Sequence, residues 1–177
     1  MTEKPCIEVL WAPWRLAYVQ DVARSAGKSE NRECIFCSAP RLSDEEALIV
    51  YRGRLAYTIL NKYPYNTGHI MIAPYRHIAS PEDLSKEEAI EIFELLAISV
   101  KALKKAFGPH GFNVGANIGE VAGAGVPGHF HLHVVPRWFG DSNFMVVVGK
   151  TKVMPQLLSD TWSIFRKAFS ETLGESR

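Results

Sequence analysis

Residues 128–138 constrain this chain more than any other stretch. They contain His129, His131 and His133, which alternate with a phenylalanine and a leucine. Alternation with a period of two is typical of a β-strand that has one buried face. We therefore expect a strand here whose three histidines share one face, while the apolar residues pack into a core on the other side.

These three histidines cannot all bind one metal ion. Along a strand, the Cα atoms of His129 and His133 lie roughly 13 Å apart, too far for both rings to reach one ion at about 2.1 Å without a strong bend. A division of labour fits better. A neutral imidazole at His131 can act as a nucleophile, while the outer two orient it or contact phosphate.

The run His129-Phe130-His131-Leu132-His133-Val134-Val135 resembles the motif of the histidine triad family of nucleotide hydrolases and transferases. In that family the middle histidine attacks the α-phosphorus of a nucleotide. The nucleotidyl-histidine intermediate is then resolved by water or another acceptor. The resemblance implies that His131 is the nucleophile and that His129 and His133 belong to the same catalytic site.

Composition limits the alternatives. The chain has 177 residues, enough for one domain with a proper core and short for two. Its 20 Lys and Arg against 19 Asp and Glu give a net charge of +1, so no charge pattern suggests a nucleic-acid partner. The sequence shows no signal peptide and no apolar run that could span a membrane. We therefore expect a cytoplasmic protein without a membrane partner.

Three cysteines, an odd number, do not suggest a disulfide framework. Cys34 and Cys37 form a Cys-x-x-Cys pair, which is found in redox motifs, as half of a zinc site, or by chance. Bacterial histidine triad proteins that resemble this chain hold a structural zinc with such a pair, a histidine after a central strand and the first triad histidine. The resemblance therefore implies structural Zn²⁺ on Cys34, Cys37, His77 and His129, and no organic cofactor.

The remaining sequence predicts an antiparallel sheet covered by helices, an α+β fold. Besides the triad, strands are expected at residues 47–51, 55–61, 69–77, 112–119 and 144–148. Ser85 and Glu88 form a capping box that starts a long helix, which ends at Gly108. A closing helix is expected over about 155–173.

Two segments are candidates for nucleotide binding. Asn61 and His69 match family residues that bind the ribose and approach the active site, although alone each would more often be a turn or strand residue. Asn117 and the glycine-rich connection 120–128 lie directly before the triad, where backbone amides can approach a phosphate. An ordinary flexible hairpin loop is the alternative. The loop residues expected at the phosphate are Gly123, Ala124, Gly125 and Val126.

This loop also departs from the family. Many relatives carry Gln or Ser followed by Thr or Ser at the positions of Gly125 and Val126. Neither residue can form a side-chain hydrogen bond. Backbone amides must replace those side chains, or the leaving group is protonated in another way.

Residues outside the motif extend the resemblance. Trp11, Pro13 and Arg15, and the segment after Trp138, resemble the diadenosine tetraphosphate phosphorylase-like branch of the family. The N-terminal aromatic residues either close over the core, stack on a purine or anchor a subunit interface. We divide the chain into an aromatic and linker segment 1–33, a histidine triad domain 34–138 and an extension 139–177 of the same domain. The resemblance implies a homodimer.

Together these features predict an enzyme that cleaves dinucleoside polyphosphates, such as diadenosine tetraphosphate, through a nucleotidyl-histidine. Inorganic phosphate as the acceptor gives phosphorolysis, which the branch features favour slightly, and water gives hydrolysis. Two alternatives remain open. One is a nucleoside phosphoramidate hydrolase, and the other is a zinc-stabilised nucleotide-binding module without catalysis.

Overall fold

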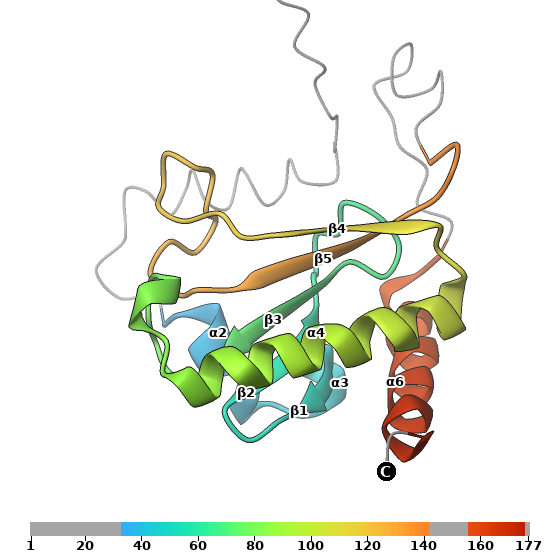
Figure 1. Cartoon of the computed structure of the whole chain (residues 1–177), viewed down its shortest axis with the longest axis horizontal. Coiled ribbons are helices and arrows are strands. Elements are labelled where there is room, and N and C mark those ends of the chain that lie inside the picture. Colours follow the sequence, from blue (N-terminus) through green and yellow to red (C-terminus); the bar gives the residue numbers. More distant parts are fainter. Residues whose placement is uncertain (1–32, 142–155, 176–177) are drawn as a thin grey trace, which may run out of the picture.

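The computed structural model describes residues 33–141 and 156–175. Their strands form one five-stranded sheet in the order β1-β2-β3-β5-β4, and every neighbouring pair is antiparallel (Figure 1). The strands are β1 (Ile49–Arg52), β2 (Ala56–Leu60), β3 (Ile70–Pro74), β4 (Gly111–Gly115) and β5 (Leu132–Arg137). The triad strand β5 therefore lies inside the sheet, between β3 and the edge strand β4.

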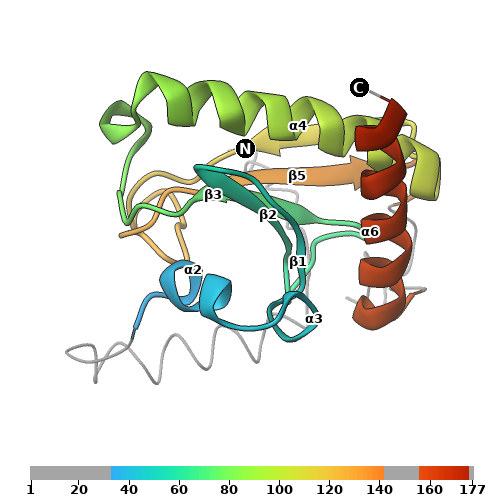
Figure 2. The same ribbon diagram turned by 90° about the horizontal axis from the view of Figure 1, so that it is seen from below.

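Helices cover both faces of the sheet (Figure 2). The long α4 crosses one face, the short α2 and α3 lie on the other, and α6 packs against β1 and α4. The helices are α2 (Ile35–Ser38), the 3₁₀ turn η1 (Ala39–Arg41), α3 (Asp44–Ala47), the 3₁₀ turn η2 (Pro81–Asp83), α4 (Lys86–Phe107) and α6 (Leu158–Glu175). This arrangement confirms the predicted α+β class. No helix within these ranges combines the length and apolar character needed to cross a lipid bilayer.

Alternation along the central strands builds two cores. In β2, Ala56 and Leu60 belong to the core beneath α4, whereas Tyr57 and Ile59 pack toward α2. Every residue of β2 and β3 is buried. Two buried faces explain why these strands read as continuous apolar runs.

The capping box of α4 forms as predicted. The Ser85 side chain accepts from the Glu88 amide, and the Glu88 carboxylate accepts from the Ser85 amide at 2.8 Å. At the other end, Gly108 adopts the left-handed conformation (φ 57°) that closes the helix. The apolar stripe between these ends faces the sheet, as its spacing predicted.

The strand predicted over residues 69–77 already ends at Pro74, and the triad strand and the strand predicted over 112–119 were wrong at their ends for related reasons. The triad strand starts only at Leu132, because its partner β3 ends at Pro74, which has no N–H to continue the ladder. The amide of Phe130 instead donates to the carbonyl of Ile78 at 2.6 Å. Since β5 starts late, β4 has no partner beyond Gly115, so Asn117 lies past the strand end rather than within it.

The aromatic segment 10–18 and the predicted strand 144–148 lie outside the described residues.

The ion pair between Glu88 and Arg76 predicts an acid-sensitive part of stability. Two hydrogen bonds, at 2.7 and 3.0 Å, join the groups, and the Arg76 guanidinium lowers the pKa of the buried Glu88 to about 2 although burial opposes this. Because this folded-state pKa lies below the unfolded value of about 4.3, the stabilisation is present above pH 4.3 and is lost as the pH falls toward 2. Glu88→Gln should lower the free energy of unfolding at pH 7 by about 2 kcal/mol, since Arg76 is half exposed.

Urea unfolding at pH 7 and pH 3 tests this, with Glu87→Gln at the exposed neighbouring position as the control. The difference between the native protein and Glu88→Gln should shrink at pH 3. An equal difference at both pH values would contradict a role for the charge.

Candidate functional site

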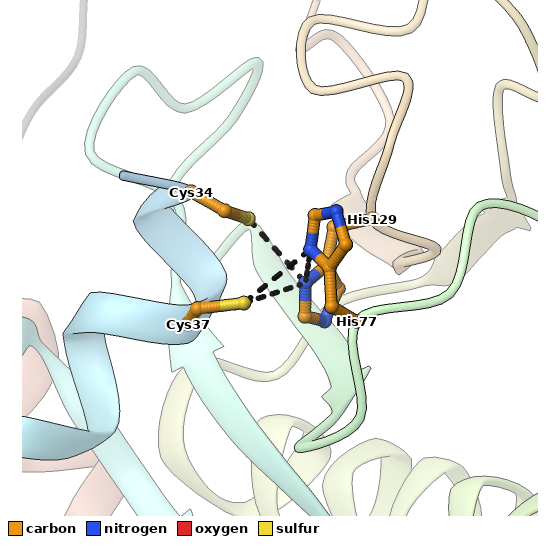
Figure 3. A group of neighbouring side chains, drawn as sticks. All are labelled: Cys34, Cys37, His77 and His129. Atoms are coloured by element: carbon orange, nitrogen blue, oxygen red, sulfur yellow. Dashed lines mark hydrogen bonds between the residues drawn. The ribbon is translucent and has the colours of Figure 1, made fainter. Parts of the chain in front are cut away.

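Two clusters of side chains meet where α2 approaches the end of β3 and the start of β5. The first contains two thiols and two imidazoles, from Cys34, Cys37, His77 and His129 (Figure 3). Cys34 is the N-cap of α2 and Cys37 lies within that helix. His77 follows β3 and His129 precedes β5. All four donor atoms lie within 4.8 Å of one another.

The geometry of this cluster fits a tetrahedral metal ion. The Nδ1 atom of His129 lies 3.3 Å from Nδ1 of His77 and 3.4 Å from Sγ of Cys34, and Sγ of Cys37 lies 3.4 Å from Nδ1 of His77. Ligand atoms at about 2.0 to 2.3 Å from a zinc ion would be separated by about 3.3 to 3.8 Å. The sequence therefore selected four residues that the fold brings together, and these residues could bind a metal ion.

Protonation also suits a ligand set. Nε2 of His129 lies 2.9 Å from the carbonyl oxygen of Pro74, which can only accept, so the ring hydrogen sits on Nε2 and the Nδ1 lone pair faces the sulfurs. Burial lowers the pKa of His129, which favours the neutral ring that binds metals. Burial and the adjacent Cys34 raise the pKa of the Cys37 thiol, so its thiolate is favoured only with a cation among the donors.

The second cluster contains His131, His133, His69 and Asn61. His131 is 6% exposed. Its Nδ1 lies 2.7 Å from the backbone carbonyl oxygen of His129. Because that oxygen can only accept, Nδ1 carries the hydrogen and Nε2 carries the lone pair. Burial lowers the pKa of His131, which keeps the ring neutral. The arrangement provides an oriented imidazole with an unprotonated Nε2.

Phe36 connects the two clusters, and sequence reasoning did not select it. Its ring stacks on His131 at 4.6 Å and tilts against His129 at 5.2 Å, and it is 1% exposed. Phe36 sits between Cys34 and Cys37, so the segment that supplies two thiols also supports the face of His131. The only sequence signal was an apolar residue enclosed by the cysteine pair.

His133 pairs with His69, the residue directly before β3. Nε2 of His69 lies 3.0 Å from Nδ1 of His133. The backbone amide of Tyr65 donates to Nδ1 of His69 at 3.0 Å, so the hydrogen of His69 sits on Nε2 and is donated to His133. His133 then keeps its own hydrogen on Nε2. Its ring lies 4.9 Å from that of His131.

Asn61 lies beside this pair. Its Oδ1 accepts from the amide of Tyr63 at 2.9 Å, and its Nδ2 lies 3.4 Å from Nδ1 of His69. The Tyr65 ring stacks on His69 at 5.0 Å with an interplanar angle of 17°. Sequence reasoning missed Tyr65, whose one signal was its place in the aromatic turn before His69.

The glycine-rich loop is partly closed on itself. The amide of Gly123 donates to Glu120, and that of Ala124 donates to Gly119. Nδ2 of Asn117 donates to the carbonyl of Gly123 at 3.3 Å. These contacts engage two of the four amides that we expected at a phosphate. Further along the loop, Val126 packs against the hydrophobic core that contains Phe36, whose ring stacks on His131.

Comparison with known proteins supplies the family. The HIT domain family profile matches residues 43–140. The chain belongs to the HIT family. Among HIT relatives, it is 45% identical over 157 residues to a Mycobacterium tuberculosis protein named AP-4-A phosphorylase, a match that covers 88% of this chain and 80% of that protein. It is 33% identical over 104 residues to an adenosine 5'-monophosphoramidase of Schizosaccharomyces pombe, which covers 59% of this chain and 74% of that protein.

Solved HIT structures agree with the fold. A zinc-bound histidine triad family protein from Mycobacterium smegmatis is similar with a TM-score of 0.66 at 23% identity, over 82% of this chain and 98% of that one. A histidine triad nucleotide-binding protein from Sulfolobus tokodaii gives a TM-score of 0.62 at 25% identity, over 80% and 93% of the two chains. The predicted histidine triad fold is therefore confirmed.

Proposed function

We propose that this protein is an enzyme that cleaves dinucleoside polyphosphates through a nucleotidyl intermediate on His131. The observation that carries the proposal is the 2.7 Å contact between Nδ1 of His131 and the His129 carbonyl, which leaves Nε2 unprotonated in a buried ring. The substrate class is supported by the 45% identity to the protein named AP-4-A phosphorylase. Phosphorolysis is favoured over hydrolysis for the same reason.

In the proposed first step, Nε2 of His131 attacks the α-phosphorus in line with the leaving polyphosphate. A P–N bond forms and a P–O bond breaks, so the imidazole becomes cationic. The carbonyl oxygen of His129 stabilises this cation through the Nδ1–H contact. The proposed donor to a phosphoryl or leaving-group oxygen is the Nε2–H of His133. In the second step, inorganic phosphate or water attacks the same phosphorus and releases His131.

The loop supplies the remaining polar contacts in this proposal. Because the amides of Gly123 and Ala124 donate within the loop, the proposed phosphate contacts fall to the amides of Gly125 and Val126, with Asn117 beside them. Since neither Gly125 nor Val126 has a polar side chain, the His133 Nε2–H is the proposed donor to the leaving group. Asn61 is the proposed ribose contact.

A second candidate function is hydrolysis of nucleoside phosphoramidates, supported by the identity to the S. pombe monophosphoramidase. The same nucleophile would serve, because attack at the α-phosphorus would break a P–N instead of a P–O bond. A nucleotide-binding module without turnover is the remaining alternative.

We also propose that Cys34, Cys37, His77 and His129 hold a structural Zn²⁺, and that no organic cofactor is needed. A closed site with four protein ligands would tie α2 to the ends of β3 and β5 without using His131. Thiol ligands kept reduced agree with a cytoplasmic location.

The proposed assembly is a homodimer formed through α4 and the edge strand β4. Val114 on β4 is 46% exposed and Phe93 on α4 is 67% exposed, and unpaired edge strands of this kind invite pairing with a second chain.

Product analysis with diadenosine tetraphosphate tests the function. With inorganic phosphate we expect ADP and ATP, and in its absence little turnover. AMP and ATP in plain buffer would indicate hydrolysis instead.

His131→Ala should lower kcat on the order of 1,000-fold or more while nucleotide binding is kept. His110→Ala, at an exposed histidine that bonds to Phe139, is the control. Full turnover by His131→Ala would exclude this nucleophile.

Metal analysis tests the zinc proposal. The native protein should contain one zinc ion per chain, and Cys34→Ser should lose it. Because Phe36 and His129 both support His131, loss of the metal should lower thermal stability and kcat together. Cys6→Ser, at the remaining cysteine, should keep the metal. Native protein that takes up no zinc after equilibration would refute the site.

Light scattering after size-exclusion chromatography tests the assembly. The native protein should have twice the chain mass of 19.8 kDa. Val114→Lys should shift it toward the monomer, because a charged edge residue resists strand pairing. Leu157→Lys, at an apolar side chain that is 70% exposed before α6, should not. A native monomer would rule the dimer out.

A further inference from the structure

The loop between β2 and β3 is anchored to the far end of β5 by Asn66. This side chain is 6% exposed. Its Nδ2 donates to the carbonyl oxygen of Pro136 at 3.0 Å and to Oδ2 of Asp141 at 2.9 Å. Both amide hydrogens of Asn66 thus have acceptors on a segment about 70 positions further along the chain. None of these residues belongs to the proposed nucleotide or metal site.

The acceptor Asp141 is itself firmly held. Arg137 donates to both of its oxygens, at 2.6 and 2.9 Å, and the amide of Trp138 donates to Oδ2 at 3.3 Å. The Asp141 side chain is 8% exposed. A two-pronged guanidinium–carboxylate pair is among the most directional contacts available to a protein, and here its carboxylate is buried although its guanidinium is 43% exposed. Asn66 is therefore bonded to a carboxylate that is itself held in place by Arg137.

Asn66 also connects Pro136 and Asp141 to His69, through the loop between β2 and β3. The backbone carbonyl of Asn66 accepts from the amide of His69 at 3.1 Å. Tyr65 directly precedes Asn66. Its backbone N–H donates to Nδ1 of His69 at 3.0 Å, and its ring stacks on the same imidazole. The amide that faces His69 is the N–H of Tyr65, one residue before Asn66 in the same short loop, so displacement of Asn66 would also shift this amide.

That amide decides where two ring hydrogens sit. While Tyr65 donates to Nδ1 of His69, the hydrogen of His69 lies on Nε2 and is given to Nδ1 of His133. Without it, only the longer 3.4 Å contact from Nδ2 of Asn61 would oppose a hydrogen on Nδ1 of His69, and the bond between the rings could run the other way. His133 would then donate from Nδ1 and lose the hydrogen on Nε2. A donor toward a phosphoryl oxygen would become an acceptor that repels it.

We propose that Asn66 is a positioning residue, which holds the Tyr65 amide on His69 and thereby fixes His133 in the tautomer with its hydrogen on Nε2. The catalytic consequence rests on the proposed function, because it needs the His133 Nε2–H to face the substrate. The tautomer itself does not depend on any reaction.

Ring-nitrogen NMR of the full chain labelled with ¹⁵N-histidine, without nucleotide, tests the tautomer directly. The His133 signals are assigned as those that vanish in His133→Gln. In the native protein, Nδ1 of His133 should be unprotonated and Nε2 protonated. In Asn66→Ala, the Nε2 signal should move toward the unprotonated position. Asn113→Ala, which removes an exposed partner of Arg137 but leaves both Asn66 contacts, is the control and should match the native spectrum.

Kinetics with diadenosine tetraphosphate then separate positioning from general damage. Asn66→Ala should lower kcat by roughly 10- to 100-fold with a much smaller change in KM. Asp141→Asn, which replaces the acceptor of Asn66 without changing its shape, should give an intermediate loss and serves as the test if Asn66→Ala does not fold.

Failure of the positioning role of Asn66 and failure of the proposed enzymatic function give different results. A native tautomer of His133 in folded Asn66→Ala, or in Asp141→Asn where that variant stands in, would overturn the positioning role whatever the activity. Altered tautomers in a protein that turns over no nucleotide would support the positioning of His133 and refute the proposed function.

Discussion

The hydrogen bond from Nδ1 of His131 to the carbonyl oxygen of His129 is the contact on which the rest of the site depends. Residues 129–131 precede the ladder, because β5 pairs with β3 only from Leu132 onward, and there the carbonyl of His129 accepts from the ring of His131. Pro74, at the end of β3, accepts from the His129 ring, so one strand end fixes His129 and, through it, His131. Phe36 closes the remaining face of that imidazole.

The imidazoles share one physical device. The hydrogen on His129 is set by the carbonyl of Pro74, that on His131 by the carbonyl of His129, and that on His69 by the amide of Tyr65. A backbone carbonyl can only accept and an amide can only donate, so none of these assignments can reverse while the backbone stays in place. The fold thereby fixes the protonation pattern through main-chain groups rather than through charged partners.

The sequence predicted the parts of this site that local periodicity encodes. Alternation placed Phe130 in the core beneath α4 and the histidines on the other side, even though the ladder starts only at Leu132. The two metal-site histidines were found by family resemblance, because a Cys-x-x-Cys pair names no partners. The bond of Asn66 to Asp141 joins positions 75 apart. No pattern in a single sequence encodes such a pairing, and the internal bonds of the 120–128 loop depend on backbone angles that glycine leaves open.

The first cluster, formed by Cys34, Cys37, His77 and His129, joins segments that are synthesised far apart in time. Cys34 and His129 are 95 positions apart, so the cluster closes a long loop of chain. Closing such a loop is entropically unfavourable until the intervening strands have paired, which makes the cluster a late event in folding. A chain emerging from the ribosome therefore holds only three of the four donors, from Cys34, Cys37 and His77, until residue 129 has been synthesised. We expect the four-donor cluster and the oriented imidazole of His131 to be completed together.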